Sequence, residues 1–206
     1  MRAQGKMLTL IAAGLVLILA QGRPALADDI SDRLKKGTEL YEQGDLAGAL
    51  EELELAITQI RQKKGEALEK VFPAAPAGWQ AEKAESQAAG PGMFGGGVTA
   101  TQAYRQTSGE GTAEIQIISD SPLIQTLGMF LANPMFLQGG EQGKLVVIKG
   151  QKALLKKTGD DSAELQTLLD NKVLVRVEVS GVKGPDQVAQ TFAEAIEFEK
   201  IRALNK

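Results

Sequence analysis

The residue types that carry most enzymatic chemistry are absent from this chain. Its 206 residues include no histidine and no cysteine, which removes Ser-His-Asp triads, thiol nucleophiles, thiolate metal sites and disulfide bonds. Acid–base or hydrolytic chemistry would have to use paired carboxylates or a lysine base. No spacing among the 26 acidic residues singles out such a pair. We therefore predict a protein that is not an enzyme and has no catalytic, cofactor-binding or metal-binding residues.

Two other patterns, one of methionines and one of glycines, do not complete a ligand site. Met93, Met129 and Met135 carry the thioether sulfur that binds Cu(I), but they are scattered and lack the histidine that usually completes such a site. The glycine-rich residues 90–97 are not followed by the Gly-Lys-Ser/Thr of a phosphate loop. Neither pattern predicts a cofactor.

Large apolar side chains in loop-like segments are more informative. Such side chains either fill the core or contact a hydrophobic ligand, a protein partner or a membrane surface. We combine them with three residues of a predicted N-terminal helical hairpin. The resulting candidate interaction surface comprises Leu40, Tyr41, Leu53, Met93, Phe94, Met129, Phe130, Met135 and Phe136.

The first 27 residues have the pattern of a cleavable export signal. Arg2 and Lys6 precede a 14-residue apolar run over residues 7–20. The small-residue motif of residues 25–27, Ala-Leu-Ala, follows the run. The run is shorter than the roughly 20 residues that span a bilayer, which argues against an uncleaved anchor. We expect cleavage after Ala27 and a periplasmic or secreted protein with no stable membrane anchor.

Removal of the signal would leave 20 basic and 26 acidic residues, a net charge of −6. Such a chain has no general attraction for nucleic acid or for anionic lipid. The remaining 179 residues suit one domain, or one domain with a small appendage.

Residues 28–71 predict a helical hairpin. In its first helix, apolar residues recur three and four positions apart, and Gly44 ends that helix. Asp45 is placed to cap the second helix. That helix carries one apolar stripe, formed by Leu46, Ala49, Leu50, Leu53, Ala56, Ile57 and Ile60.

This hairpin resembles a single tetratricopeptide repeat over residues 33–61. Small Gly37 and Ala49 match the positions where helices of that family approach closely, and Gly44-Asp45 matches the turn. Arg33 and Arg61 depart from the pattern, because the family often has Trp and Pro there. An ordinary helical hairpin with an Ala/Gly interface is the alternative. Because one repeat cannot bury its own apolar face, we expect the hairpin to pack on its own chain, a second copy or a partner.

The remainder of the chain predicts an α+β domain. We expect residues 72–97 to be a Pro/Ala/Gly-rich linker and loop, in which Trp79 anchors the next domain. From residue 98 the apolar period changes to two. Over residues 98–206 we predict two strands, a helix at 123–133, four strands and a final helix. The final helix is expected to open at residues 184–186 and to include Ile196 on its buried face. Hairpin-length connections make the predicted sheet mainly antiparallel, flanked by two helices.

This order of elements resembles the PsbP-like α/β/α sandwich over residues 72–203, and the Pro-Ala-Gly-Trp entry at residues 76–79 fits that class. The resemblance implies a non-catalytic binding or assembly protein. We therefore expect an exported adaptor that acts through contact with a protein partner or through self-association. The alternative is a small hydrophobic ligand or lipid, bound in a pocket near residues 123–137.

Overall fold

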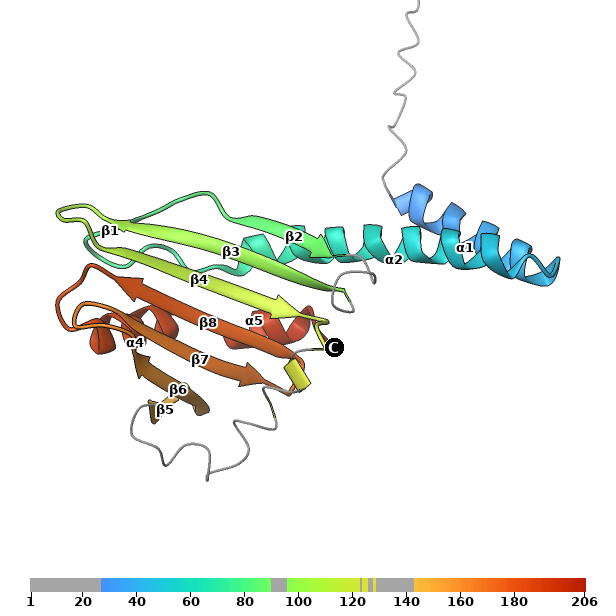
Figure 1. The fold of residues 1–206 in the computed structure, drawn as a ribbon. Helices are drawn as coiled ribbons and strands as arrows, with labels where there is room; N and C mark the ends of the chain where they lie inside the picture. The colour runs from blue at the N-terminus through green and yellow to red at the C-terminus, as the bar shows by residue number, and fades with distance from the viewer. Residues whose placement is uncertain (1–26, 90–95, 123, 126–127, 129–142) are drawn as a thin grey trace, which may run out of the picture.

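A computed structural model describes residues 27–89, 96–122, 124–125, 128 and 143–206. It has an N-terminal pair of helices, an eight-stranded antiparallel sheet, and two C-terminal helices against one face of that sheet (Figure 1). The predicted α+β class, with a helical hairpin followed by an antiparallel sheet, is therefore confirmed.

The hairpin consists of α1 (Ala27–Glu42) and α2 (Leu46–Leu68). Gly44 takes the left-handed conformation, with φ of 81°, in the turn between them. The Asp45 carboxylate accepts a hydrogen bond from the backbone N–H of Gly48 at 3.0 Å and so caps α2. The predicted turn and cap are both confirmed.

The last third of α2 joins the hairpin to the sheet. Leu68 is fully buried in the main core, and Gly65 is also buried. A Cβ atom on Gly65 would lie 2.7 Å from the Ser86 hydroxyl oxygen, so only glycine allows this approach of helix and strand. Arg61 donates a hydrogen bond to the carbonyl of Ala89 at 3.2 Å. A short 3₁₀ helix, η1 (Glu69–Val71), follows.

The sheet runs in the order β1-β3-β4-β8-β7-β6-β5, and β2 pairs with β3 beside β1. Every pairing is antiparallel. The strands are β1 (Trp79–Ala81), β2 (Glu85–Ala89), β3 (Gly97–Gln106), β4 (Thr112–Ser119), β5 (Lys144–Ile148), β6 (Gln151–Lys157), β7 (Ala163–Leu169) and β8 (Val173–Ser180).

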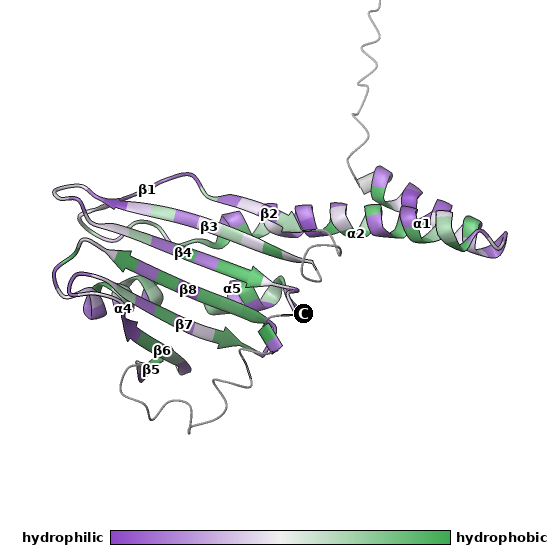
Figure 2. Cartoon of the chain, viewed as in Figure 1, coloured by the Kyte–Doolittle hydropathy of each residue, from purple (hydrophilic) through white to green (hydrophobic). Residues whose placement is uncertain are grey.

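Buried and more exposed residues alternate along the strands, so one face of the sheet is buried and the other is open. Val173, Val175, Val177 and Val179 of β8 point into the core, as their period of two predicts. The intervening residues Leu174, Arg176 and Glu178 lie on the open face. Helix α4 (Pro185–Ala195) packs across β7 and β8 on the buried face, and α5 (Phe198–Ala203) completes the core with Phe198 and Ile201. Figure 2 shows apolar residues concentrated along these central strands.

An aromatic cluster closes the core between α4 and the sheet. The Phe192 ring lies 5.0 Å, centroid to centroid, from Trp79 in an edge-on arrangement and 5.0 Å from Tyr104. Tyr104 is fully buried, and its hydroxyl lies 2.9 Å from the carbonyl oxygen of Pro73. Burial raises the pKa of the Tyr104 hydroxyl well above its ordinary value. Trp79, the first residue of β1, therefore packs against the core of the sheet domain, as predicted.

Two details differ from the sequence prediction. Residues 72–97, expected as linker and loop, contribute β1 and β2, because short strands pair with both halves of the long β3 despite weak alternation of their own. The final helix ends at Ala195, and Ile196 is buried but extended, with ψ of 134°. A second helix, α5, follows it. Most of the helix expected at 123–133 lies outside the described residues, so that helix stays a prediction.

The aromatic cluster generates a stability prediction. Phe192→Ala deletes a ring that is 0% exposed and contacts two other aromatics. We expect a loss of about 4 kcal/mol in the free energy of unfolding, because of lost burial and the cavity left behind. Urea unfolding followed by fluorescence of Trp79, the single tryptophan, measures this loss. The exposed neighbour Thr191→Ala should cost less than about 1 kcal/mol. Equal losses would contradict the packing described.

Candidate functional site: the apolar groove of the hairpin

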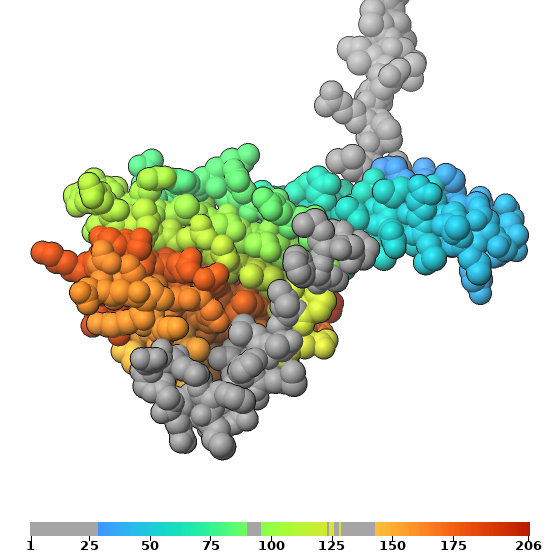
Figure 3. Space-filling view, in the orientation of Figure 1, coloured from blue at the N-terminus to red at the C-terminus, as the bar shows by residue number. Residues whose placement is uncertain are grey.

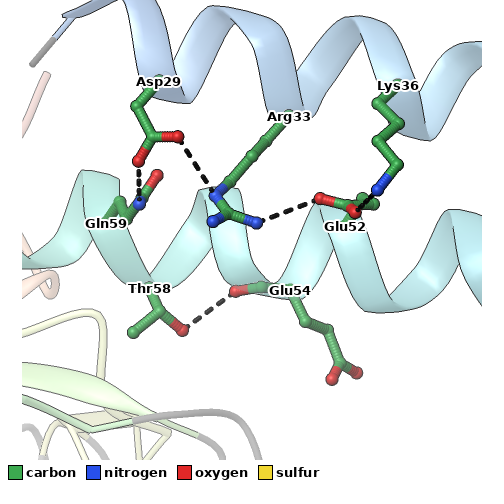
Figure 4. A network of polar contacts seen from close by, with 7 residues as sticks. All are labelled: Asp29, Arg33, Lys36, Glu52, Glu54, Thr58 and Gln59. Carbon is green, nitrogen blue, oxygen red and sulfur yellow. Dashed lines mark hydrogen bonds and ion pairs between the residues drawn. The ribbon is translucent and has the colours of Figure 1, made fainter.

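The two sides of the helical hairpin differ in character. On one side, Arg33 of α1 lies between Asp29 and Glu52 and donates to Glu52 at 3.1 Å (Figure 4). Lys36 also bonds the Glu52 carboxylate, and Gln59 donates to Asp29 at 2.6 Å. These contacts join the two helices on their polar side, and the charged side chains there are paired with one another.

Glu52 is central to this polar side, because it comes from α2 and contacts two cations of α1. Its side chain is only 12% exposed. The hydrogen bond from Lys36, together with the charges of Lys36 and Arg33, holds the pKa of Glu52 below its ordinary value of 4.5, against the opposing effect of burial.

Between the helices, small residues allow close packing. A Cβ on Gly37 would lie 3.1 Å from Cγ of Leu53 and 3.5 Å from the carbonyl oxygen of Ala49. Ala49 and Ala56 are almost fully buried against α1. The small residues identified from sequence are therefore the residues at which the helices approach.

On the opposite side from the ion pairs, the hairpin carries an apolar groove. Its volume is about 520 Å³, and all of its lining residues belong to the two helices. We call this surface the hairpin groove, defined by Gly37, Thr38, Tyr41, Leu46, Ala49, Leu50 and Leu53.

The groove is open to solvent at its large apolar side chains. Tyr41 is 67% exposed, Leu46 59% and Leu50 62%. Ile57 and Ile60 extend the stripe along α2 and are also exposed. Figure 3 shows this part of the hairpin projecting from the body of the molecule, and Figure 2 shows apolar residues on it. A contiguous exposed apolar surface of this kind is typical of sites that contact another molecule.

The structure brings together two of the predicted interaction residues. Tyr41 and Leu53 line the hairpin groove, whereas Leu40 is half-buried and is not among the lining residues. The other six predicted residues, Met93, Phe94, Met129, Phe130, Met135 and Phe136, lie outside the described residues. Leu46 and Leu50 were assigned to the packing stripe and missed as site residues. The apolar stripe of α2 is wider than one neighbouring helix can cover, and this width could have identified Leu46 and Leu50 as exposed.

A second hollow, on the open face of the sheet, is polar. It has a volume of about 420 Å³ and includes Glu114 and Glu178, which lie directly opposite each other on β4 and β8. Glu178 accepts a hydrogen bond from Arg176 at 2.5 Å, and Glu114 accepts one from Gln116 at 2.6 Å. The two charged residues that line the hollow are both acidic, and each accepts a hydrogen bond from a residue of its own strand. Within the described residues, no group of three acidic side chains is arranged to hold a metal ion.

Within the described part of the chain, no helix is both long and apolar enough to cross a bilayer. No model of a known protein family matches the sequence, and no curated protein or solved structure is significantly similar to it. The resemblances to a tetratricopeptide repeat and to the PsbP-like sandwich therefore stay predictions, and the function has to be inferred from the hairpin groove.

The ion pairs at Glu52 generate a pH prediction. Because the pKa of Glu52 is lowered on folding, its contribution to hairpin stability is present above pH 4.5 and is lost as pH falls through the lowered value. A carbon-detected NMR titration of the Glu52 carboxyl should give a pKa below 4.5. Lys36→Gln should raise that pKa, whereas Lys35→Gln, whose lysine faces Asp32 instead, should not. A Glu52 pKa that is unchanged by Lys36→Gln would contradict the ion-pair network described above.

Proposed function

We propose that this protein is a non-enzymatic interaction protein that acts through protein–protein contact, and that the hairpin groove is its docking surface. One observation carries the proposal. The groove is lined almost wholly by apolar side chains, yet Tyr41, Leu46 and Leu50 are more than half exposed. Covering such a surface with a complementary apolar partner is favourable by about 25 cal/mol for each Å² removed from water.

The shape of the groove supports an α-helix as the element that docks there. The groove lies between two antiparallel helices and follows a stripe with spacings of four, three, four and three residues from Leu46 to Ile60. A helix with its own apolar stripe presents ridges that fit such a groove. An extended strand would leave its backbone N–H and C=O groups without partners on this surface, because the hairpin has no free strand edge.

The position of the hairpin on the sheet domain supports a role for that domain as the base that carries the hairpin. The last third of α2 is fixed to the sheet through Leu68 and Gly65, while the groove lies on the projecting part. The groove therefore stands clear of the core that holds the fold together. In this proposal the sheet domain presents the hairpin rather than performing chemistry.

We further propose that the protein works outside the cytoplasm, in the periplasm or as a secreted protein. The support is the sequence pattern of residues 1–27 alone, with its basic start, its 14-residue apolar run and its Ala-Leu-Ala exit. The absence of cysteine means that the exported fold relies on its core and not on disulfides.

A site-specific crosslink tests the docking surface. A photo-reactive amino acid at position 50, inside the groove, should give a discrete crosslinked protein in the cells that produce the chain. The same group at position 55 should give about tenfold less product, because Leu55 is equally apolar and 42% exposed but is not among the groove residues. Electrophoresis and mass spectrometry of the products measure both.

A companion substitution checks that the crosslink reports docking. Leu46→Asp places a charge that would be buried in any apolar contact, so it should abolish the product formed from position 50. Because Leu46 is 59% exposed, the sheet should remain folded, with unchanged Trp79 fluorescence. Equal crosslinking from positions 50 and 55, or a product that survives Leu46→Asp, would reject the groove as the docking surface.

A further inference from the structure

Helix α1 is attached to the molecule through α2. Within the described residues its only extensive contact is with α2, and the main hydrophobic core there contains no residue of α1. Figure 1 shows α1 lying along the projecting part of α2, away from the sheet. The attachment of α1 therefore depends on the interface between the two helices of the hairpin.

That interface buries little of α1. Among residues 29–42, Gly37 is the only buried residue, and a glycine has no side chain to remove from water. Ile30, Arg33 and Leu40 are half-buried, and Tyr41 is 67% exposed. A helix of 16 residues is only marginally stable in water without tertiary packing, and a glycine near its middle lowers its helical propensity. Contacts with α2 therefore have to hold α1 in place.

The polar contacts between the two helices lie near solvent. Lys36, which pairs with Glu52, is 62% exposed, and Arg33 is 30% exposed. The hydrogen bond from Gln59 to Asp29 is also at the surface. Exposed ion pairs contribute little to stability, because water and salt screen them. We therefore expect that separating α1 from α2 costs much less free energy than unfolding the sheet.

Helix α2 has anchors that do not involve α1. Leu68 is buried in the main core, Lys64 pairs with Asp120 at 2.6 Å, and Arg61 donates a hydrogen bond to the carbonyl of Ala89. This anchored last third is a helical nucleus, from which the rest of α2 propagates at low cost. Helix α1 has no such nucleus once it leaves its partner. Opening of the hairpin is therefore expected to unfold α1 before α2.

We propose that α1 is a releasable helix, which opens from α2 as a unit while α2 and the sheet stay folded, and that this opening switches the hairpin groove off. Three of the residues that line the groove, Gly37, Thr38 and Tyr41, belong to α1, so the groove exists only while α1 is in place. Gly44, with its φ of 81° in the turn, has the conformational freedom of a hinge. The regulatory role rests on the proposed function of the groove, whereas the opening of α1 does not.

Native-state hydrogen exchange, on the chain purified from the cells that make it, tests the opening. Backbone amides of α1 beyond its first turn should be protected at least about 100-fold less than those of β8. Amides of α2 at residues 50–60 should be protected at least about tenfold more than those of α1. Amides of α1 as protected as those of β8 would overturn the proposal, and so would equal exchange of α1 and residues 50–60.

A substitution in the ion-pair network tests what holds α1 closed. Glu52→Gln removes the charge that pairs with Arg33 and Lys36, so exchange of the α1 amides should become about fivefold faster. The carboxylate of Glu54 points away from both cations in Figure 4, so Glu54→Gln should change this rate by less than about twofold. Amides of β8 should respond to neither substitution. Equal responses of α1 to the two variants would show that these ion pairs do not hold the helix.

Breaking α1 tests the link to docking. Glu39 is exposed and is not among the groove residues, and Glu39→Pro prevents α1 from forming alongside the groove. The crosslinked product from position 50 should then fall at least about tenfold, whereas Glu39→Ala should leave it unchanged. Trp79 fluorescence should be unchanged in both variants, because the core described above contains no residue of α1. Undiminished crosslinking in Glu39→Pro would overturn the switch.

The releasable helix and the docking function fail in different ways. If position 50 of the unaltered chain gives no crosslinked product, the docking function is rejected and the regulatory role with it, while hydrogen exchange still measures the opening of α1. If α1 is as protected as β8, the releasable helix is rejected, and the groove remains a permanently formed docking surface that the crosslink tests.

Discussion

The structure depends on the double role of helix α2, which packs against α1 along its first two-thirds and against the sheet along its last third. Gly37, Ala49 and Ala56 allow the first contact, and Gly65 and Leu68 form the second. A helix has a single apolar stripe with limited width, and α1 covers only one edge of it. The uncovered edge, from Leu46 to Ile60, is a consequence of this geometry and becomes the groove.

Two features explain why this exposed face does not collapse into the core of the same molecule. The ion pairs of Arg33 and Lys36 with Glu52 join α1 and α2 on the side of the hairpin away from the groove. The docking of Leu68 and Gly65 fixes α2 on the sheet, so the hairpin projects. The contacts that place α2 between α1 and the sheet therefore also leave the groove exposed.

The sequence predicted the fold where local chemistry decides it. The Gly44-Asp45 turn and the alternating valines of β8 are set by backbone conformation and by a period of two, and both are present as expected. Strands β1 and β2 were missed because their three and five residues carry little alternation and are held by pairing with β3. The break at Ile196 depends likewise on burial in the core, which no local pattern encodes.

Prediction of the candidate site was limited by a different factor. Periodicity shows that Leu46, Leu50 and Leu53 share one face of a helix, but it does not show how much of that face a neighbour covers. In the structure Leu53 packs on Gly37, while Leu50 is 62% exposed, although both belong to the same stripe. The difference comes from the crossing of α1 over α2, a tertiary property.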